Sequence, residues 1–331
     1  MSALRRILVS IKDPARGVTP AASKAAQLAR ASGARLELFH AITTPLYLDI
    51  QVYSDWTLED TKRELMKART EQMQRIAKTL MGRAHQQALR MDVTVVWDWP
   101  GYAAIVRRAA EFRADLVVAD RHAGRHFARA VMRFADWELL RLCPVPVLLV
   151  GLQASYQRPV TLAAVDPAHL WEKSAQLDER ILRVAASVNG ALGGTLHAVH
   201  AYVSSLPVSY PTTVMYPKFG EKLAHRLSVA AKRRFERVMR GKRIARGCQH
   251  LVDASPIIGI TDTVRSIRAD LIVMGAVSRS GIRRLLIGNT AESLLDRLSC
   301  DLLIVKPARF KARVARTSNG VRVIPALPMT I

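Results

Sequence analysis

The chain contains one sequence pattern twice. Ala114–Val118 (Ala-Asp-Leu-Val-Val) recurs 155 residues later as Ala269–Val273 (Ala-Asp-Leu-Ile-Val). Val147–Val150 (Val-Leu-Leu-Val) recurs at the same offset as Leu302–Val305 (Leu-Leu-Ile-Val). An offset that stays constant across well-separated segments predicts two tandem copies of one domain.

The chain length agrees with this duplication. A total of 331 residues fits two domains of about 150 residues each. We predict a first domain at residues 1–151, a second at residues 158–308, and a basic C-terminal tail at residues 309–331.

Within each predicted domain, short runs rich in Val, Leu and Ile alternate with longer helical patterns. Continuous apolar runs are typical of strands covered on both faces, and strand–helix alternation produces a parallel sheet. We therefore expect two tandem α/β domains, each an open, doubly wound parallel sheet of five strands. The expected strands are 7–11, 36–42, 93–97, 116–119 and 145–150, then 160–165, 196–203, 250–253, 271–274 and 302–305. The expected helices are 21–31, 60–89, 102–112, 177–188, 221–243 and 257–268.

The net charge of +23 is the unusual bulk property. Such a surface attracts anions, either as small molecules or as an acidic partner. We expect no specific nucleic-acid binding, because no recognition module is evident and aromatic residues make up only 6% of the chain.

We also expect no transmembrane segment, since no apolar run approaches about 20 residues. Cys143, Cys248 and Cys300 show no paired spacing, which indicates reduced thiols and a cytoplasmic location.

No pattern of a catalytic or metal site is evident. The chain lacks a GxSxG elbow, an HExxH helix, a Walker lysine and a metal-ligand cluster. We predict no catalytic residues and no metal ligands, and therefore a binding protein and not an enzyme.

Three segments of the second domain are expected to converge. In open α/β sheets, ligands bind beyond the carboxyl ends of the strands, where the strand order reverses. Asp166 follows the first strand, Ala201 lies near the end of the second, and Gly275 ends the fourth. Asp166 can accept hydrogen bonds from a ligand, or it can belong to an ordinary turn.

A basic loop follows Gly275 and leads to the expected start of the next helix. Exposed amides at a helix N-terminus attract phosphate, although the same residues can cap a helix with no ligand. The residues concerned are Gly288, Asn289 and Thr290 at the helix start, Ser278 within the loop, and the cationic Arg279, Arg283 and Arg284.

This strand–Gly–loop–Gly–helix segment resembles the universal stress protein family. Its nucleotide-binding members carry Gly, two residues, Gly, nine residues, Gly, then Ser or Thr. Gly275 and Gly288 match the first and third glycines, whereas Ser278 and Asn289 replace the second glycine and the hydroxyl residue. The resemblance implies an adenine nucleotide hydrolase-like fold, with Asp166 facing the adenine of ATP or another adenine nucleotide and Ala201 packing near it.

The first domain departs further from the family pattern. At the offset of 155, the counterparts of Gly275, Ser278, Gly288 and Asn289 are Asp120, Ala123, Arg133 and Phe134. Asp120 would repel a phosphate, so we expect a degenerate site there. The string from Asp136 to Val150 is similar to tandem-domain members of the family, which implies a bacterial stress-resistance protein.

Three functions stay open from the sequence alone. The first is a ligand-binding stress protein whose second domain holds a small anionic ligand, either nucleotide-like or amphiphilic. The second is a protein with residual ATP binding or ATPase activity. The third is a ligand-free interaction module that uses the pseudo-twofold pair of domains, as an intramolecular pseudo-dimer or as a homodimer.

Overall fold

The structure is a computed structural model of the whole chain. It describes residues 4–44, 46–48, 55–82, 89–121, 137–151, 153–168, 176–204, 217–276, 297–298, 300–308, 310, 314–321 and 323–325. The chain divides into two compact units. One contains Ala3–Ser155 together with Lys311–Ile331, and the other contains Tyr156–Phe310 with Met1–Ser2.

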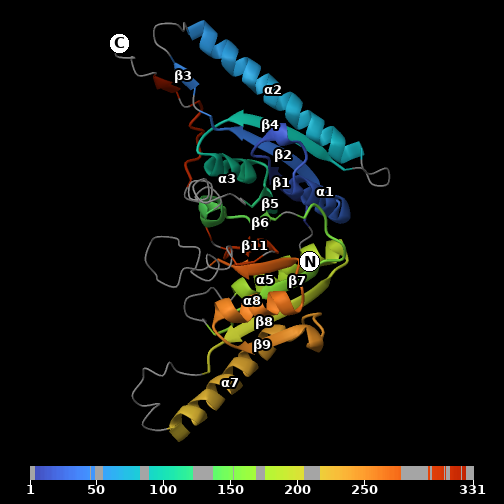
Figure 1. Cartoon of the computed structure of the whole chain (residues 1–331), viewed down its shortest axis with the longest axis vertical. Coiled ribbons are helices and arrows are strands. Elements are labelled where there is room, and N and C mark those ends of the chain that lie inside the picture. Colours follow the sequence, from blue (N-terminus) through green and yellow to red (C-terminus); the bar gives the residue numbers. More distant parts are fainter. Residues whose placement is uncertain are drawn as a thin grey trace. The chain divides into compact units, whose positions relative to one another are not determined.

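The unit of the first domain has a parallel sheet with the strand order β4-β2-β1-β5-β6 (Figure 1). Its order reverses between β1 and β5, as in doubly wound folds. The strands are β1 (Arg6–Ser10), β2 (Arg35–Ile42), β4 (Met91–Trp97), β5 (Leu116–Asp120) and β6 (Val147–Val150). The helices are α1 (Pro20–Ser32), α2 (Asp55–Gly82) and α3 (Gly101–Glu111).

The second unit repeats this arrangement with the order β11-β10-β7-β8-β9. The strands are β7 (Val160–Ala164), β8 (Thr195–Tyr202), β9 (Gln249–Asp253), β10 (Leu271–Gly275) and β11 (Asp301–Val305). Its helices are α5 (Gln176–Leu192), α7 (Pro217–Met239) and α8 (Pro256–Ser266). The predicted α/β class with parallel sheets is therefore confirmed.

The duplication extends to single backbone angles. Gly33 and Gly193, which end α1 and α5, have φ values of +70° and +64°. Arg113 and Arg268, 155 residues apart, have φ values of +53° and +50° and precede the repeated Ala-Asp dipeptide. Positive φ is rare for residues other than glycine. The same unusual backbone conformation therefore follows equivalent helices in both copies, α1 and α5 as well as α3 and α8.

The repeated aspartate in Ala-Asp-Leu supports the fold. The Oδ2 atom of Asp115 accepts hydrogen bonds from the backbone amides of Arg5 and Arg6, at 2.9 and 3.0 Å. In the second unit, Asp270 Oδ2 accepts a hydrogen bond from the Val160 amide at 2.8 Å. Each carboxylate thus holds the start of the first strand of its sheet, so the repeated acid has a structural role in both copies.

Three predicted helices differ from the structure by four residues or more at one end or both. The helix expected at 177–188 is α5, which continues to Leu192. The helix expected at 60–89 is α2, which begins at Asp55 and ends at Gly82. The helix expected at 221–243 is α7, which spans Pro217–Met239. Gly241 follows with φ at +72°, so the backbone turns into a left-handed conformation before Arg243.

The C-terminal segment packs on the unit of the first domain. Strand β12 (Val323–Pro325) pairs in parallel with β3 (Leu46–Leu48). Upstream of β12, the Asn319 amide donates to Asp98 Oδ1 at 3.0 Å. The guanidinium of Arg107 donates to the carbonyl of Ala315 at 3.1 Å. This segment therefore crosses a buried ion pair between Arg107 and Asp98.

Within the part of the chain that the structure describes, no helix combines the length and apolar character needed to cross a membrane.

Candidate functional site

The candidate site lies at the carboxyl edge of the second sheet. Strands β7 and β10 are neighbours, and Met274 is paired with Ala164 at their ends. Asp166 follows β7 by two residues, while Gly275 is the last residue of β10. Ala201 lies near the end of β8, on the other side of β7. The structure therefore brings these three predicted residues to one edge, at the point where strand order reverses.

A second carboxylate supports the turn after β7. The backbone amide of the half-buried Asp166 donates to Asp178 Oδ1 at 3.2 Å, and Asp178 lies in the first turn of α5. No sequence motif pointed to Asp178, which lies 12 residues further along the chain. The contact positions the Asp166 main chain at the sheet edge.

Gly275 has a packing role that is independent of any ligand. A Cβ atom added at this position would lie 2.9 Å from Leu177 Cδ2 and 3.1 Å from Ile181 Cδ1. Both neighbours belong to α5 and are buried. The absence of a side chain at Gly275 lets the end of β10 lie close against the start of this helix.

Ala201, on β8, packs against helix α8. Its Cβ would be 2.9 Å from a Cβ added at Gly259, which is a buried residue of α8. A small residue at position 201 therefore allows close packing of β8 on α8.

The remaining predicted site residues lie outside the described residues. These are Ser278, Gly288, Asn289, Thr290, Arg279, Arg283 and Arg284. Their assignment stays a prediction, as do the roles of Asp166, Ala201 and Gly275 towards a ligand.

The equivalent edge of the first domain contains a carboxylate. Asp120, the counterpart of Gly275, ends β5, and its Oδ1 accepts a hydrogen bond from the Ala21 amide at 2.9 Å. Ala21 lies in the first turn of α1, where exposed amides and the helix dipole favour a negative charge. Lys12 Nζ donates to the carbonyl of Asp120 at 3.3 Å. A carboxylate held by the start of α1 thus lies at the position where the second domain has Gly275.

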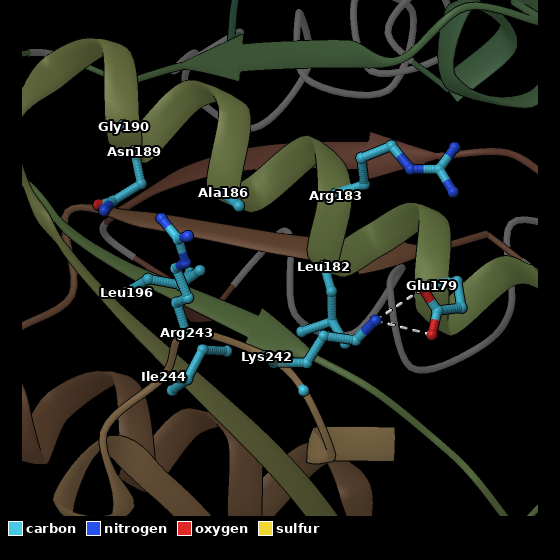
Figure 2. Close-up of a pocket in the computed structure, with 11 residues that line it drawn as sticks. Glu179, Leu182, Arg183, Ala186, Asn189, Gly190, Leu196, Lys242, Arg243 and Ile244 are labelled. Carbon is cyan, nitrogen blue, oxygen red and sulfur yellow. Dashed lines mark hydrogen bonds and ion pairs between the residues drawn. The ribbon is translucent and has the colours of Figure 1, made fainter. Parts of the chain in front are cut away.

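A hollow of about 780 Å³ lies beside α5 in the second unit (Figure 2). Its walls combine aliphatic side chains, including Leu182, Leu196 and Ile244, with the cationic side chains of Arg183 and Arg243. Lys242 Nζ also lines it and is paired with both carboxylate oxygens of Glu179 at 2.8 Å. The volume falls in the range of small-molecule sites, and the lining suits an anion with an apolar body.

Two histidines contact each other on β8 and β9. His197 Nδ1 lies 3.0 Å from His250 Nε2, and the rings stack with their centroids 5.3 Å apart. Burial lowers the pKa of His197, and the neighbouring His250 lowers it further. Burial also lowers the pKa of His250. Both rings therefore favour the neutral form in the folded protein.

Among the described residues, no group of three or more His, Cys, Asp or Glu side chains is arranged to hold a metal ion. Cys143, Cys248 and Cys300 form no disulfide bonds.

The repeated sheets and their shared edge geometry define a tandem α/β protein with two related domains. The model of the universal stress protein family matches residues 3–151 and 162–306, so the chain belongs to this family. The resemblance expected from the glycine-loop segment is confirmed at the level of the family.

Similar proteins match both domains. Universal stress protein E of Escherichia coli (strain K12) is 26% identical over 323 residues, covering 95% of this chain and 98% of its own. A universal stress protein E homolog from Haemophilus influenzae is 28% identical over 231 residues, covering 67% and 71%. The match to universal stress protein E extends over both domains of this chain, which confirms the expected similarity to tandem-domain members.

Solved structures share the fold. A crystal structure of a functionally unknown protein from Pseudomonas aeruginosa PAO1 has a TM-score of 0.66 at 23% identity, covering 92% of this chain and 94% of that chain. A putative universal stress protein from Pseudomonas aeruginosa UCBPP-PA14 has a TM-score of 0.65 at 24% identity, with the same coverage.

Proposed function

We propose that this universal stress protein binds a small anionic, adenine nucleotide-like ligand in its second domain and acts by binding and not by catalysis. The observation that carries the proposal is the placement of Asp166 and Gly275 on neighbouring strands at the point of order reversal. Asp166 would accept a hydrogen bond from the base, with Ala201 beside it. Gly275, Ser278 and Gly288 would border the phosphates.

Charge and helix geometry supply the rest of the proposed site. Asn289 and Thr290 would offer helix N-terminal amides to the phosphates, and Arg279, Arg283 and Arg284 would add positive charge. The first domain would not bind the ligand, because Asp120 places a carboxylate where the second domain has Gly275, and a carboxylate repels phosphate. We place the protein in the bacterial cytoplasm, and the absence of disulfide bonds among its three cysteines supports this location.

The first experiment compares native and denaturing mass spectra of the purified full-length protein. Any small molecule that is bound in the native spectrum and released on denaturation is then identified. The second is thermal unfolding with ATP at millimolar concentration. A ligand present at 100 times its Kd stabilises the folded state by about 2.7 kcal/mol. We expect ATP to raise the melting temperature of the wild type.

Variants separate the two domains. We expect Asp166→Ala to weaken ATP binding by about tenfold, because loss of a hydrogen bond to the base costs about 1.4 kcal/mol. Asp13→Ala, at the matching Asp-Pro dipeptide of the first domain, is the control and should leave ATP binding unchanged. Absence of any released nucleotide, together with no ATP-induced shift, would contradict the proposal.

An amphiphilic ligand is the second candidate, and the hollow beside α5 favours it. Its aliphatic walls and cationic Arg183 and Arg243 match an apolar body with one anionic group. Release of a lipid-like species in the mass spectrometry experiment would support this ligand class. Release of inorganic phosphate from added ATP and a divalent metal would instead support the ATPase alternative.

The interaction-module alternative needs no small ligand. It gains support if nothing is released and ATP causes no thermal shift. Size measurement in solution would then show whether the chain is a monomer with an internal pseudo-dimer or a homodimer.

A further inference from the structure

Helix α7 has a charge distribution that its counterpart in the first domain lacks. Residues 217–246, which cover α7 and the turn after it, contain eleven Lys and Arg against two Asp and Glu. Helix α2 occupies the equivalent place in the first domain, since it precedes the edge strand β4 as α7 precedes the edge strand β9. It contains six basic residues against five acidic ones. The two copies of one helix have therefore diverged strongly in charge.

The charges on α2 are partly paired, and those on α7 are not paired within the described residues. On α2, Lys62 pairs with Glu59 and Arg63 pairs with Asp60, both three residues apart. No ion pair of an α7 side chain is found in the part of the chain that the structure describes. The excess positive charge of α7 thus remains available to an external anion.

Four exposed arginines define the basic face of α7, namely Arg226, Arg233, Arg234 and Arg237. Together with His225, Val229 and Ala230 they line a hollow of about 450 Å³. The positive groups therefore lie together on one open face of the helix, where their electrostatic potentials add.

The opposite side of α7 fixes the helix on the sheet. Ala231, Phe235 and Met239 are each about 5% exposed or less. Tyr202 on β8 contacts Ser228 on α7, with the two hydroxyl oxygens 3.0 Å apart. The apolar side of the helix is thus used internally and is not free to insert into a bilayer, which distinguishes α7 from amphipathic membrane helices.

We propose that the basic face of α7 binds the phosphodiester backbone of nucleic acid without reading its sequence. Between residues 217 and 246, arginine outnumbers lysine by seven to four, and arginine can bind phosphate through two parallel hydrogen bonds. A helix of 23 residues is about 34 Å long, which equals the axial rise of roughly ten phosphates of one DNA strand. Aromatic residues make up only 6% of the chain, so the contact depends on phosphate charge more than on base stacking.

The test compares two charge-matched variants of the full-length protein. Arg226→Gln/Arg233→Gln/Arg237→Gln removes three charges from the basic face. Lys67→Gln/Arg75→Gln/Lys78→Gln removes three exposed charges from α2. Binding to a duplex of arbitrary sequence, about two helical turns long, is measured by fluorescence anisotropy between roughly 50 and 200 mM salt.

We expect the α7 variant to lose at least about tenfold in affinity at low salt. The slope of log K against log salt should become shallower by about 2.7, or about 0.9 for each lost phosphate contact. The α2 variant should bind like the wild type. Equal loss in both variants would show that only net charge matters and would overturn the proposal.

Two further readouts test the fold of the variant and the identity of the partner. Thermal unfolding of the α7 variant, with and without ATP, should match the wild type, because the substituted residues are exposed and none of them belongs to the proposed nucleotide site. Vesicles of anionic lipid are the competing polyanionic surface. If the α7 substitutions abolished vesicle binding and left duplex binding unchanged, a membrane surface would replace nucleic acid as the partner.

Discussion

The Oδ1 atom of Asp120 accepts a hydrogen bond from the backbone amide of Ala21 at 2.9 Å, joining the end of β5 to the first turn of α1. When α1 and α5 are aligned at Gly33 and Gly193, Ala21 corresponds to Ile181. In the second unit, Gly275 packs against Ile181, where the first unit has a carboxylate against a small residue. The same strand–helix junction is therefore held by a hydrogen bond in the first copy and by close apolar packing in the second.

Loss of the Asp120 carboxylate should destabilise the first domain. Removal of a side-chain acceptor at a helix start typically costs about 1 kcal/mol. We expect Asp120→Ala to lower the free energy of unfolding by about that amount, measured by urea denaturation. Asp120→Asn keeps an acceptor oxygen and removes the charge, so it should lose less. Equal stability of the alanine variant and the wild type would contradict a capping role.

Gly275→Ala tests whether this glycine is required for packing. The new Cβ would meet Leu177 Cδ2 at 2.9 Å, and such overpacking typically costs about 1–3 kcal/mol. Leu177→Ala should itself be destabilising, because Leu177 is fully buried. In the Leu177→Ala background, however, Gly275→Ala should cost less than in the wild type. A double-mutant cycle measures this coupling, and strict additivity would show that Leu177 does not limit the space at position 275.

The strands, the parallel sheets and the family could be predicted from the sequence because each depends on local or repeated patterns. Val, Leu and Ile runs mark the buried strands, and the constant offset between Asp115 and Asp270 marks the duplication. The predicted end of α7 was wrong because helical periodicity continues to Arg243, while the left-handed Gly241 stops the helix first.

Parts of the site were not accessible from the sequence. Asp178 contacts the Asp166 amide only because α5 folds back across the sheet edge. The close approach of Gly275 to Leu177 likewise depends on the packing of α5 against β10. A glycine in a motif does not show whether a ligand or a neighbouring helix requires the space.

The His197–His250 contact predicts a loss of stability in mild acid. Both histidines have a pKa below the ordinary value in the folded state, chiefly because of burial. Below about pH 6.5, the unfolded chain therefore binds more protons than the folded protein, and the free energy of unfolding falls with falling pH. Each histidine contributes a slope of at most about 1.4 kcal/mol per pH unit.

The measurement is urea unfolding at several pH values from mildly alkaline to mildly acidic. His197→Gln/His250→Gln should show a shallower decline than the wild type. His40, whose pKa is also lowered chiefly by burial, is retained in both proteins, so their difference isolates the pair. An identical pH profile for the two proteins would contradict the prediction.

The buried ion pair under the C-terminal segment should contribute more to stability than an exposed pair of similar geometry. Arg107 Nη2 lies 2.6 Å from Asp98 Oδ2, and their side chains are only 7% and 5% exposed. Removal of one partner of a buried pair leaves an uncompensated charge and costs about 3–5 kcal/mol. We expect Arg107→Met to lower the free energy of unfolding by this amount.

The exposed pair of Arg35 and Asp92 provides a matched control in the same unit. Its closest N–O distance is 2.5 Å, but its side chains are 55% and 38% exposed. Solvent screens such pairs, so Arg35→Met should leave the unfolding midpoint nearly unchanged. Arg107→Met should also release the C-terminal segment, because Ala315 loses its guanidinium donor and Asp98 loses its counter-ion beside Asn319. Limited proteolysis should therefore cut that segment faster in Arg107→Met than in Arg35→Met, and equal cutting rates would show that β12 pairing alone holds it.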